Sequence, residues 1–419
     1  MGAAQDEAHR VTERVARESY GRLVAFLAAR TGDIAGAEDA LAEAFAAALA
    51  SWPRSGAPDN PDAWLLTVAR RRQGDALRRR QTGRAGEAHL TLMAEELAAG
   101  ADVPGEIPDR RLALMFACAH PEIEPRLRAP LILQTVLGFT AADIAAAFLV
   151  PPATMGQRLV RAKSRIKAAA IPFRLPDPQE LPARVAAVLE AVYAGYAKGW
   201  DESGDTAPSP LAGEAIWLGR LLVAQLPDEP EAKGMLALML YSEARRPARR
   251  DEAGGYVPLD EQDTGLWDRR QITLAGALLR EASVTGASGR YQLEAAIQSA
   301  HVARRMLGEA NWPAIVALYD HLLRQVASPV VALNRAVALA QVEGPEAALV
   351  EIERLAGDAR MADYQPYWAA RGHLCARVGR IADAAEALRL ALGLSADPAV
   401  RDYLQRRLDA LSDGDGIAT

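Results

Sequence analysis

The chain has 419 residues, of which 50% are hydrophobic and 24% are charged. This balance excludes a disordered chain, and the length predicts more than one hydrophobic core. No stretch approaches 18 uncharged apolar residues, and the two cysteines, Cys118 and Cys375, are far apart in the sequence. Neither a membrane span nor a disulfide framework is therefore expected, and the sequence predicts a cytoplasmic protein.

Charge is distributed unevenly along the chain. The net charge is −6, which by itself argues weakly against a nucleic-acid partner. Residues 1–170, however, hold 22 Lys and Arg against 20 Asp and Glu, whereas residues 171–419 hold 26 against 34. This asymmetry predicts different partners for the two parts of the chain.

The first helices are predicted from apolar spacing. Residues 9–50 carry apolar side chains at helical intervals, with an interruption at Thr31–Asp33. Three prolines and a glycine predict a loop at Ser51–Pro61, because proline lacks the amide donor that a helix interior needs. A further helix is expected from Asp62 to Arg80, and the abundance of alanine favours helix elsewhere.

Arginine is concentrated in the helix predicted at 62–80. Within residues 63–80 only Asp75 offsets six arginines: Arg70, Arg71, Arg72, Arg78, Arg79 and Arg80. Trp64 and Leu65 begin the apolar stripe of the same helix. A guanidinium group presents a planar fork of donors that suits phosphate, so this density predicts contact with nucleic acid. An acidic protein surface is the alternative partner.

Two proline- and glycine-rich stretches mark boundaries. Residues 82–108 are punctuated by glycine and proline and are acidic, which predicts a flexible linker. Helical patterns return over 109–170, with breaks at Pro121–Pro125, at Gly138 and at Pro151-Pro152. Four prolines at Pro172–Pro182 predict a second boundary.

Residues 138–167 have the spacing of a helix-turn-helix. Thr140 is the expected N-cap of a short helix over Ala141–Phe148, and a second helix is expected to begin at Pro151-Pro152, where missing amide hydrogens cost nothing. The residues expected to pack between the two helices are Ile144, Ala145, Phe148, Val150, Met155, Leu159, Val160 and Ile166. Those left for a DNA groove and its flanking phosphates are Thr154, Gln157, Arg158, Arg161, Lys163 and Arg165. A plain helical hairpin is the alternative.

Beyond residue 182, amphipathic helices alternate with short breaks, as at Gly344-Pro345 and Asp397-Pro398. The clearest unit is Trp368–Leu394, in which small side chains and a Gly-Arg turn lie between two helices. This is the layout of a tetratricopeptide (TPR) repeat, whose small residues let paired helices pack closely. The pattern predicts a TPR-like α-solenoid with a grooved acidic surface that suits a protein or peptide partner.

Enzyme motifs are mostly missing. The sequence contains no P-loop and no HExxH, CxxC or GxSxG motif. Cys118 and His120 are two residues apart in a predicted helix and cannot point the same way, so packing is favoured over metal binding. We therefore expect neither an enzyme nor a bound metal or other cofactor.

Together these segments resemble domains 2 and 4 of extracytoplasmic-function (ECF) sigma factors, which direct bacterial RNA polymerase to promoters. The stretch Arg30–Phe45 is similar to the family segment that binds the clamp helices of the polymerase beta-prime subunit. Its matching positions are Asp39, Glu43 and Phe45, while Ala42 stands where glutamine is usual. The resemblance implies that these three residues bind core RNA polymerase.

The same resemblance implies two DNA contacts. In the family, the loop and helix that match PDNPDAWLLTVARRRQGDALRRR hold the unstacked non-template strand of the −10 element. The residues implied for this role are Asn60, Trp64, Arg70, Arg71, Arg72, Arg78 and Arg79. The helix-turn-helix would read the −35 element, and the polymerase contacts would be the beta-prime clamp helices and the beta flap. No membrane contact is implied.

The resemblance is closest to the subgroup of these factors with a large C-terminal TPR-like domain. It is carried by stretches such as FLVPPATMGQRLVRAKSRIK, IPFRLP and WDRRQI. Members of this subgroup lack a dedicated anti-sigma factor, and the resemblance implies that the extension supports or controls activity.

The sequence therefore predicts an all-α protein with four segments. They are domain 2 at 1–81, the acidic linker at 82–108, domain 4 at 109–171 and the C-terminal domain at 183–412. The linker can extend to about 90 Å, which is enough for two modules bound about 25 base pairs apart. The main alternative is a stand-alone helix-turn-helix regulator with a TPR-like sensor domain, which leaves residues 30–80 without a role. A TPR scaffold with an incidental basic helix is the other alternative.

Overall fold

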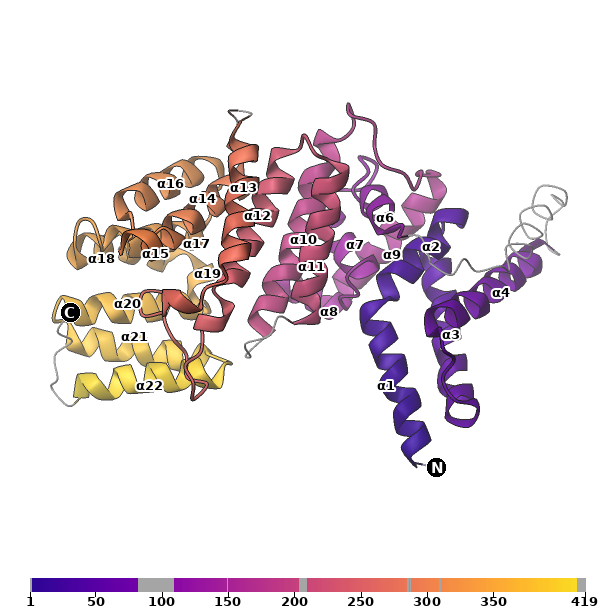
Figure 1. Cartoon of the computed structure of the whole chain (residues 1–419), viewed down its shortest axis with the longest axis horizontal. Coiled ribbons are helices and arrows are strands. Elements are labelled where there is room, and N and C mark those ends of the chain that lie inside the picture. Colours follow the sequence, from indigo (N-terminus) through magenta and orange to yellow (C-terminus); the bar gives the residue numbers. More distant parts are fainter. Residues whose placement is uncertain are drawn as a thin grey trace. The chain divides into compact units, whose positions relative to one another are not determined.

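The computed structural model describes residues 2–81, 109–148, 150–202, 209–284, 286, 288–308 and 310–412. Their regular structure is helical, with one isolated bridge between Arg250 and Tyr256 and no strand among them (Figure 1). The predicted all-α class is thus confirmed. Contacts divide the chain into two compact units, Met1–Ala197 and Lys198–Thr419. None of the described helices is both long and apolar enough to cross a membrane.

The first unit begins with a bundle of four helices. They are α1 (Gly2–Glu18), α2 (Tyr20–Thr31), α3 (Ile34–Ser55) and α4 (Pro61–Gln81). The break predicted at residues 31–33 is confirmed: Gly32 adopts a left-handed conformation with φ 64°, and the Asp33 side chain caps α3 by accepting from the Gly36 amide at 3.0 Å. Leu23, Leu41 and Leu65 are fully buried in the bundle.

The loop predicted at Ser51–Pro61 is shorter than expected. Helix α3 continues to Ser55, with Pro53 inside its last turn, and only residues 56–60 separate it from α4. The reason is tertiary, because Trp52 is buried and packs edge-on against Trp64 with ring centroids 5.3 Å apart. Burial of the Trp52 ring stabilises the last helical turn of α3, which Pro53 alone would disfavour.

Four shorter helices follow in the first unit. They are α6 (Arg111–Cys118), α7 (Pro125–Thr135), α8 (Ala141–Ala147) and α9 (Pro152–Ala168). The breaks predicted at 121–125, 138 and 151–152 are confirmed. Thr140 caps α8 as predicted: its hydroxyl accepts from the Asp143 amide at 3.1 Å and donates to the Asp143 carboxylate at 2.6 Å. Pro152 occupies the first turn of α9, again as predicted.

Most of helix α10 (Pro182–Glu202) belongs to the first unit, and its Val188, Leu189 and Val192 are buried. Arg128 of α7 also donates to the Ala183 carbonyl oxygen at 3.1 Å. The division between the two units falls inside α10, whereas the sequence predicted a boundary at Pro172–Pro182. A compact first unit therefore includes most of this helix.

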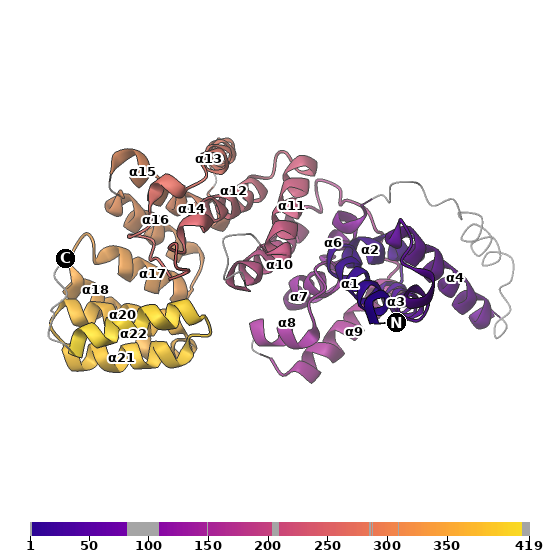
Figure 2. The same ribbon diagram turned by 60° about the horizontal axis from the view of Figure 1, so that its bottom comes forward.

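The second unit is a succession of helices and short turns. After α10 come α11 (Pro210–Gln225), α12 (Pro230–Ala244), η1 (Arg246–Ala248), η2 (Thr264–Leu266), α13 (Arg269–Ser283), α14 (Arg290–Val302), α15 (Arg304–Leu307), α16 (Trp312–Gln325), α17 (Pro329–Leu339), α18 (Pro345–Arg354), η3 (Leu355–Gly357), α19 (Ala359–Ala362), α20 (Gln365–Arg377), α21 (Ile381–Leu394) and α22 (Pro398–Ser412). Figure 2 shows α20, α21 and α22 side by side. The helix pair predicted within 368–394 is confirmed as α20 and α21. Gly372 allows their close contact, because a Cβ there would lie 2.9 Å from Leu388 Cγ.

A glycine joins the two halves of the first unit. A Cβ on Gly21 of α2 would lie 2.0 Å from the carbonyl oxygen of Val136, which follows α7. We predict that Gly21→Ala lowers the free energy of unfolding by about 1–3 kcal/mol, because backbone must move to admit the methyl group. Gly156→Ala is the matched control, since its nearest neighbour is Ala141 Cβ at 4.0 Å. Thermal unfolding of both variants would be followed by circular dichroism. Equal stability of Gly21→Ala and Gly156→Ala would contradict the close contact at Gly21.

Candidate nucleic-acid interface

The arginines of α4 lie in two different environments. Leu65, Leu66 and Ala69 form the buried face of the helix. Arg70 follows Leu66 by four residues and therefore lies on that same face, where its guanidinium stacks 4.9 Å from the centroid of the Phe26 ring. Burial and the nearby Arg30 lower the pKa of Arg70. Arg70, predicted from the sequence to contact DNA, is thus a packing residue in this structure.

The other arginines of α4 with described side chains reach the surface. Arg71, Arg72 and Arg78 are exposed. Arg72 Nε lies 3.3 Å from the Glu43 carboxylate of α3, and Arg78 Nη2 lies 2.6 Å from the Asp75 carboxylate. Exposed pairs of this kind are weak, about 0–1 kcal/mol, so phosphate can compete for both guanidinium groups. The side chain of Arg79 lies outside the described residues.

The N-terminal end of α4 carries an amide and an indole. Asn60 is exposed, and its Oδ1 accepts from the Ala63 amide at 3.0 Å, which leaves its side-chain NH2 group as a donor. Trp64 is half-buried against Trp52. An aromatic edge beside a free amide donor is suited to an unstacked base.

Helix α3 presents the acidic residues predicted to bind polymerase. Asp39 and Glu43 are exposed and one turn apart, so they share a face of the helix. Phe45 is half-buried and lies six residues after Asp39, which places it about 120° away around the helix. The structure therefore brings together two of the three residues that the sequence grouped.

Helix α9, the second helix of the helix-turn-helix, has a clear division of faces. Its buried residues include Met155, Leu159 and Ile166, as predicted. Val160 was predicted to pack inside, but its side chain is 64% exposed, because it lies about 100° around the helix from Leu159. The outward face is formed by residues at helical spacing with exposed side chains: Gln157, Val160, Arg161 and Ser164. Val160 and Ser164 are the members that the sequence prediction missed.

The remaining predicted residues of α9 differ in accessibility. Thr154 and Arg158 are half-buried, and Arg165 is exposed but pairs with Glu122. Four residues before α9 were predicted to pack against it. Ile144 and Ala145 are buried as expected, Phe148 and Val150 are half-buried, and Leu149 between them lies outside the described residues.

Lys163 is the largest departure from the predicted DNA surface. Its side chain is 8% exposed, and its Nζ lies 2.8 and 2.5 Å from the two carboxylate oxygens of Glu38 on α3. Lys167, one turn further along α9, pairs with Asp33 at the start of α3. In this structure Lys163 therefore joins α9 to α3 and is not available to a phosphate. Burial raises the pKa of Glu38 although Lys163 acts in the opposite direction.

Cys118 and His120 have separate partners. Cys118 Sγ lies 3.6 Å from Thr135 Oγ1, and burial raises the pKa of its thiol to about 12. His120 Nδ1 instead accepts from the Glu122 amide at 3.2 Å. No cluster of three or more potential metal ligands occurs in the part of the chain that the structure describes.

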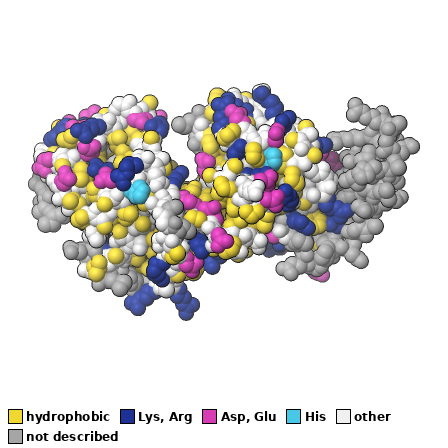
Figure 3. Space-filling view, turned by 90° about the horizontal axis from the view of Figure 1, so that it is seen from above, with side chains coloured by type: hydrophobic (Ala, Val, Ile, Leu, Met, Phe, Trp, Pro, Cys, Tyr) yellow, Lys and Arg dark blue, Asp and Glu magenta, His cyan; other side chains and the backbone are white. Residues whose placement is uncertain are grey.

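On the face seen in Figure 3, basic and acidic side chains lie interspersed with apolar ones.

An arginine-bearing helical bundle together with a helix-turn-helix is typical of DNA-binding proteins of transcription. Comparison with known families identifies both parts: residues 15–82 match sigma-70 region 2, and residues 113–166 match sigma-70 region 4. Residues 184–283 match a family of unknown function, DUF6596. The chain therefore belongs to the sigma-70 family, as an ECF-like sigma factor with an additional C-terminal domain.

An uncharacterized protein of Rhizobium meliloti (strain 1021) is 38% identical over 388 residues, which cover 90% of each chain. No solved structure matches. The two sigma-70 regions support a role in transcription initiation, with core RNA polymerase and promoter DNA as partners. The sigma factor family consists of non-enzymatic transcription regulators.

The contact between α9 and α3 can be tested by charge exchange. We predict that Lys163→Glu separates the two helices, because it places a second carboxylate beside the buried Glu38; losing one partner of such a pair costs on the order of 3 kcal/mol. Combining it with Glu38→Lys should restore the contact. Spin labels on cysteines introduced at Ala42 and Ser164, both exposed, would report the distance by double electron–electron resonance.

Arg161→Glu is the control for that experiment, since it makes the same charge reversal on the outward face of α9. A distance distribution that is the same in Lys163→Glu as in the natural chain would contradict a holding role for the ion pair.

Proposed function

We propose that this protein is an alternative sigma factor that binds core RNA polymerase and starts transcription at promoters with specific −35 and −10 elements. The observation that carries the proposal is the presence, in one compact unit, of an outward-facing helix-turn-helix surface and an exposed arginine helix. Each surface suits a different form of DNA, the first a duplex and the second a strand with unstacked bases.

The outward face of α9 has the chemistry of major-groove reading. Arginine can bind guanine through two hydrogen bonds, glutamine can bind adenine in the same way, and an apolar side chain can contact the thymine methyl group. Gln157, Val160 and Arg161 on this face, with the half-buried Arg158 beside it, supply these three kinds of group within two turns. We therefore assign −35 recognition to this face, with Thr154 and Arg165 beside it for the flanking phosphates.

The N-terminal end of α4 would act on the −10 element. Trp64 offers an aromatic ring and Asn60 an amide donor for an unstacked base, while Arg71, Arg72 and Arg78 would hold the adjoining phosphates. Stacking on an aromatic ring contributes about 1–3 kcal/mol for each base.

Polymerase binding would use the exposed acidic face of α3. Asp39 and Glu43 point the same way and can meet basic side chains of the beta-prime clamp helices. The beta flap is the expected second contact of polymerase, through the helix-turn-helix module.

The packed arrangement of the first unit must open for both DNA surfaces to work. Elements about 25 base pairs apart are separated by roughly 85 Å of duplex, at 3.4 Å for each base pair. Here α9 lies against α3, with Lys163 on Glu38 and Lys167 on Asp33. We propose that this closed form is the unbound state and that polymerase, by taking the acidic face of α3, favours separation.

The C-terminal domain would support or control initiation. Residues 198–419 hold 24 Lys and Arg against 31 Asp and Glu, so long-range repulsion disfavours direct contact with DNA. A protein target, either polymerase or the sigma modules, suits a TPR-like helical array better. A stand-alone regulator with a sensor domain is the second candidate, and it would bind promoter duplex without polymerase.

Asp39 tests the polymerase contact. We predict that Asp39→Arg reduces co-purification with core RNA polymerase at least tenfold, because a repulsive charge replaces an attractive one at the interface. Glu13→Arg makes the same change on an exposed position of α1 and should have no effect. Equal binding by the two variants, with both folded by circular dichroism, would place the interface elsewhere.

Arg158 tests promoter reading. In transcription with core polymerase on promoters that vary at each −35 position, Arg158→Ala should lose about 1–3 kcal/mol and relax the preference at one position. A loss of the same size on every sequence would show that this residue contacts only phosphate. Tight binding of promoter duplex by the chain alone would favour the stand-alone regulator instead.

A further inference from the structure

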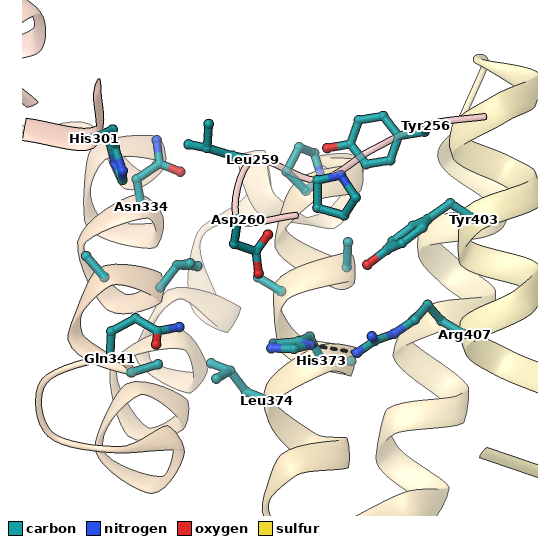
Figure 4. Close-up of a pocket in the computed structure, with 18 of the residues that line it drawn as sticks. Tyr256, Leu259, Asp260, His301, Asn334, Gln341, His373, Leu374, Tyr403 and Arg407 are labelled. Atoms are coloured by element: carbon teal, nitrogen blue, oxygen red, sulfur yellow. Dashed lines mark hydrogen bonds between the residues drawn. The ribbon is translucent and has the colours of Figure 1, made fainter. Parts of the chain in front are cut away.

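The second unit contains a cavity of about 710 Å³, which lies within the size range of small-molecule sites (Figure 4). One wall comes from α14 and α17, with His301 and Asn334, and the opposite wall from α22, with Tyr403 and Arg407. His373 on α20 lies between them. Residues far apart in the sequence thus meet around one space.

A segment over residues 249–263 crosses one side of the cavity and is held at both edges. At one edge Arg250 pairs with Asp397 at 2.5 Å, and the Tyr256 ring packs edge-on against Tyr403 at 5.5 Å. At the other edge Arg304 donates to the carbonyl oxygens of Leu259, Asp260 and Gln262 at 2.9, 2.8 and 3.2 Å. This covered side favours a compact ligand over a peptide that would run through the space.

The cavity is basic although the unit around it is acidic. Its lining includes one carboxylate, Asp260, against five arginines: Arg245, Arg249, Arg304, Arg377 and Arg407. Residues 198–419 as a whole carry seven more acidic than basic side chains. Basic side chains therefore outnumber acidic ones in this lining, although the unit as a whole is acidic.

Three of these arginines have no carboxylate partner among the described residues. Arg304 donates to the backbone carbonyls named above, Arg407 donates to His373 Nδ1 at 2.9 Å, and Arg377 is exposed toward the cavity. Because arginine has only donors, His373 must be neutral with its proton on Nε2, which makes that ring a further donor. An anion in the cavity would meet donors that are not ion-paired with a carboxylate among the described residues, although the single carboxylate of Asp260 lies in the same lining.

Two histidines of the cavity, His301 and His373, lie close to these arginines. Burial, together with Arg407 and Arg377, lowers the pKa of His373 to about 4, although Asp260 acts in the opposite direction. Burial, together with Arg245 and Arg304, likewise lowers the pKa of His301 to about 4. Both rings are thus neutral near pH 7, and a bound anion would raise both pKa values.

Apolar surface completes the cavity. Leu374, Leu388 and Leu404 lie in its lining, and Trp312 packs edge-on against His301 with ring centroids 5.4 Å apart. We propose that this cavity binds a small organic anion, a carboxylate or phosphate that carries an apolar or aromatic body. Such a ligand would give the C-terminal domain a chemical input of its own, separate from polymerase and promoter binding.

The test uses the full chain and a pair of probes that differ in charge. 2-Naphthoate and 2-naphthamide share one ring system, but only the first is an anion. In isothermal titration calorimetry at pH 7, the naphthoate should bind at least about tenfold more tightly, as expected for one charge-assisted hydrogen bond. Arg407→Gln and Arg377→Gln should each weaken naphthoate binding about fivefold or more and leave naphthamide unchanged.

Arg406→Gln is the matched control, because Arg406 is the exposed neighbour of Arg407 on α22 and does not line the cavity. Equal affinity for the two probes, no saturable binding of the naphthoate, or an equal loss in Arg406→Gln would each overturn the proposal. Acetylated tetraglutamate is the third probe. Tighter binding of this peptide than of the naphthoate, lost in Arg407→Gln, would overturn the small-molecule assignment.

Histidine resonances give an independent readout. In NMR titrations with 2-naphthoate, the ring signals of His301 and His373 should move and their pKa values should rise, whereas the exposed His9 should not change. Movement of all histidines alike would indicate a non-specific effect and would count against the cavity. Because polymerase and DNA are absent from every arm, this outcome is distinct from failure of the proposed sigma function.

Discussion

The ion pair between Lys163 and Glu38 is the contact on which the accessible surfaces of the first unit depend. It joins the helix that would read DNA to the helix that would bind polymerase, and Lys167 with Asp33 extends the contact by one turn. A half-buried charge pair is stable only when both partners are present, since either one alone would keep its desolvation cost. The proposed open form would therefore differ from the observed closed form by the loss of a discrete contact.

Arginine has three distinct roles in this chain, and its surroundings decide which one applies. Arg70 is stacked on Phe26 and contributes packing, because its hydrocarbon stem and planar head fit an apolar face. Arg71, one position further along α4, is exposed and available to phosphate. Arg304 donates to backbone carbonyl oxygens of the 249–263 segment, and it adds positive charge to the cavity of the second unit. Arginine density alone therefore overstates the size of a DNA surface.

The electrostatics of the two units suggest a division of labour. The first unit exposes arginines and a helix-turn-helix face, and the second carries net negative charge around a basic cavity. The net negative charge of the second unit would disfavour competition for DNA, while its basic cavity could still attract an anion. Such a protein could respond to a ligand without a separate anti-sigma partner, because input and output would belong to one chain.

The sequence by itself determined the helical class, the helix breaks near residues 32, 138 and 151, the cap at Thr140 and the family resemblance. These features follow from local chemistry: clusters of glycine and proline favour breaks between helices, and apolar spacing marks the helices between those breaks. Tertiary structure decided the rest. Pro53 stays helical because Trp52 is buried, and long-range packing selected the faces that bury Arg70 and Lys163 and expose Val160. The cavity could not be predicted, because residues as distant as Arg304 and Arg407 meet only when the chain folds.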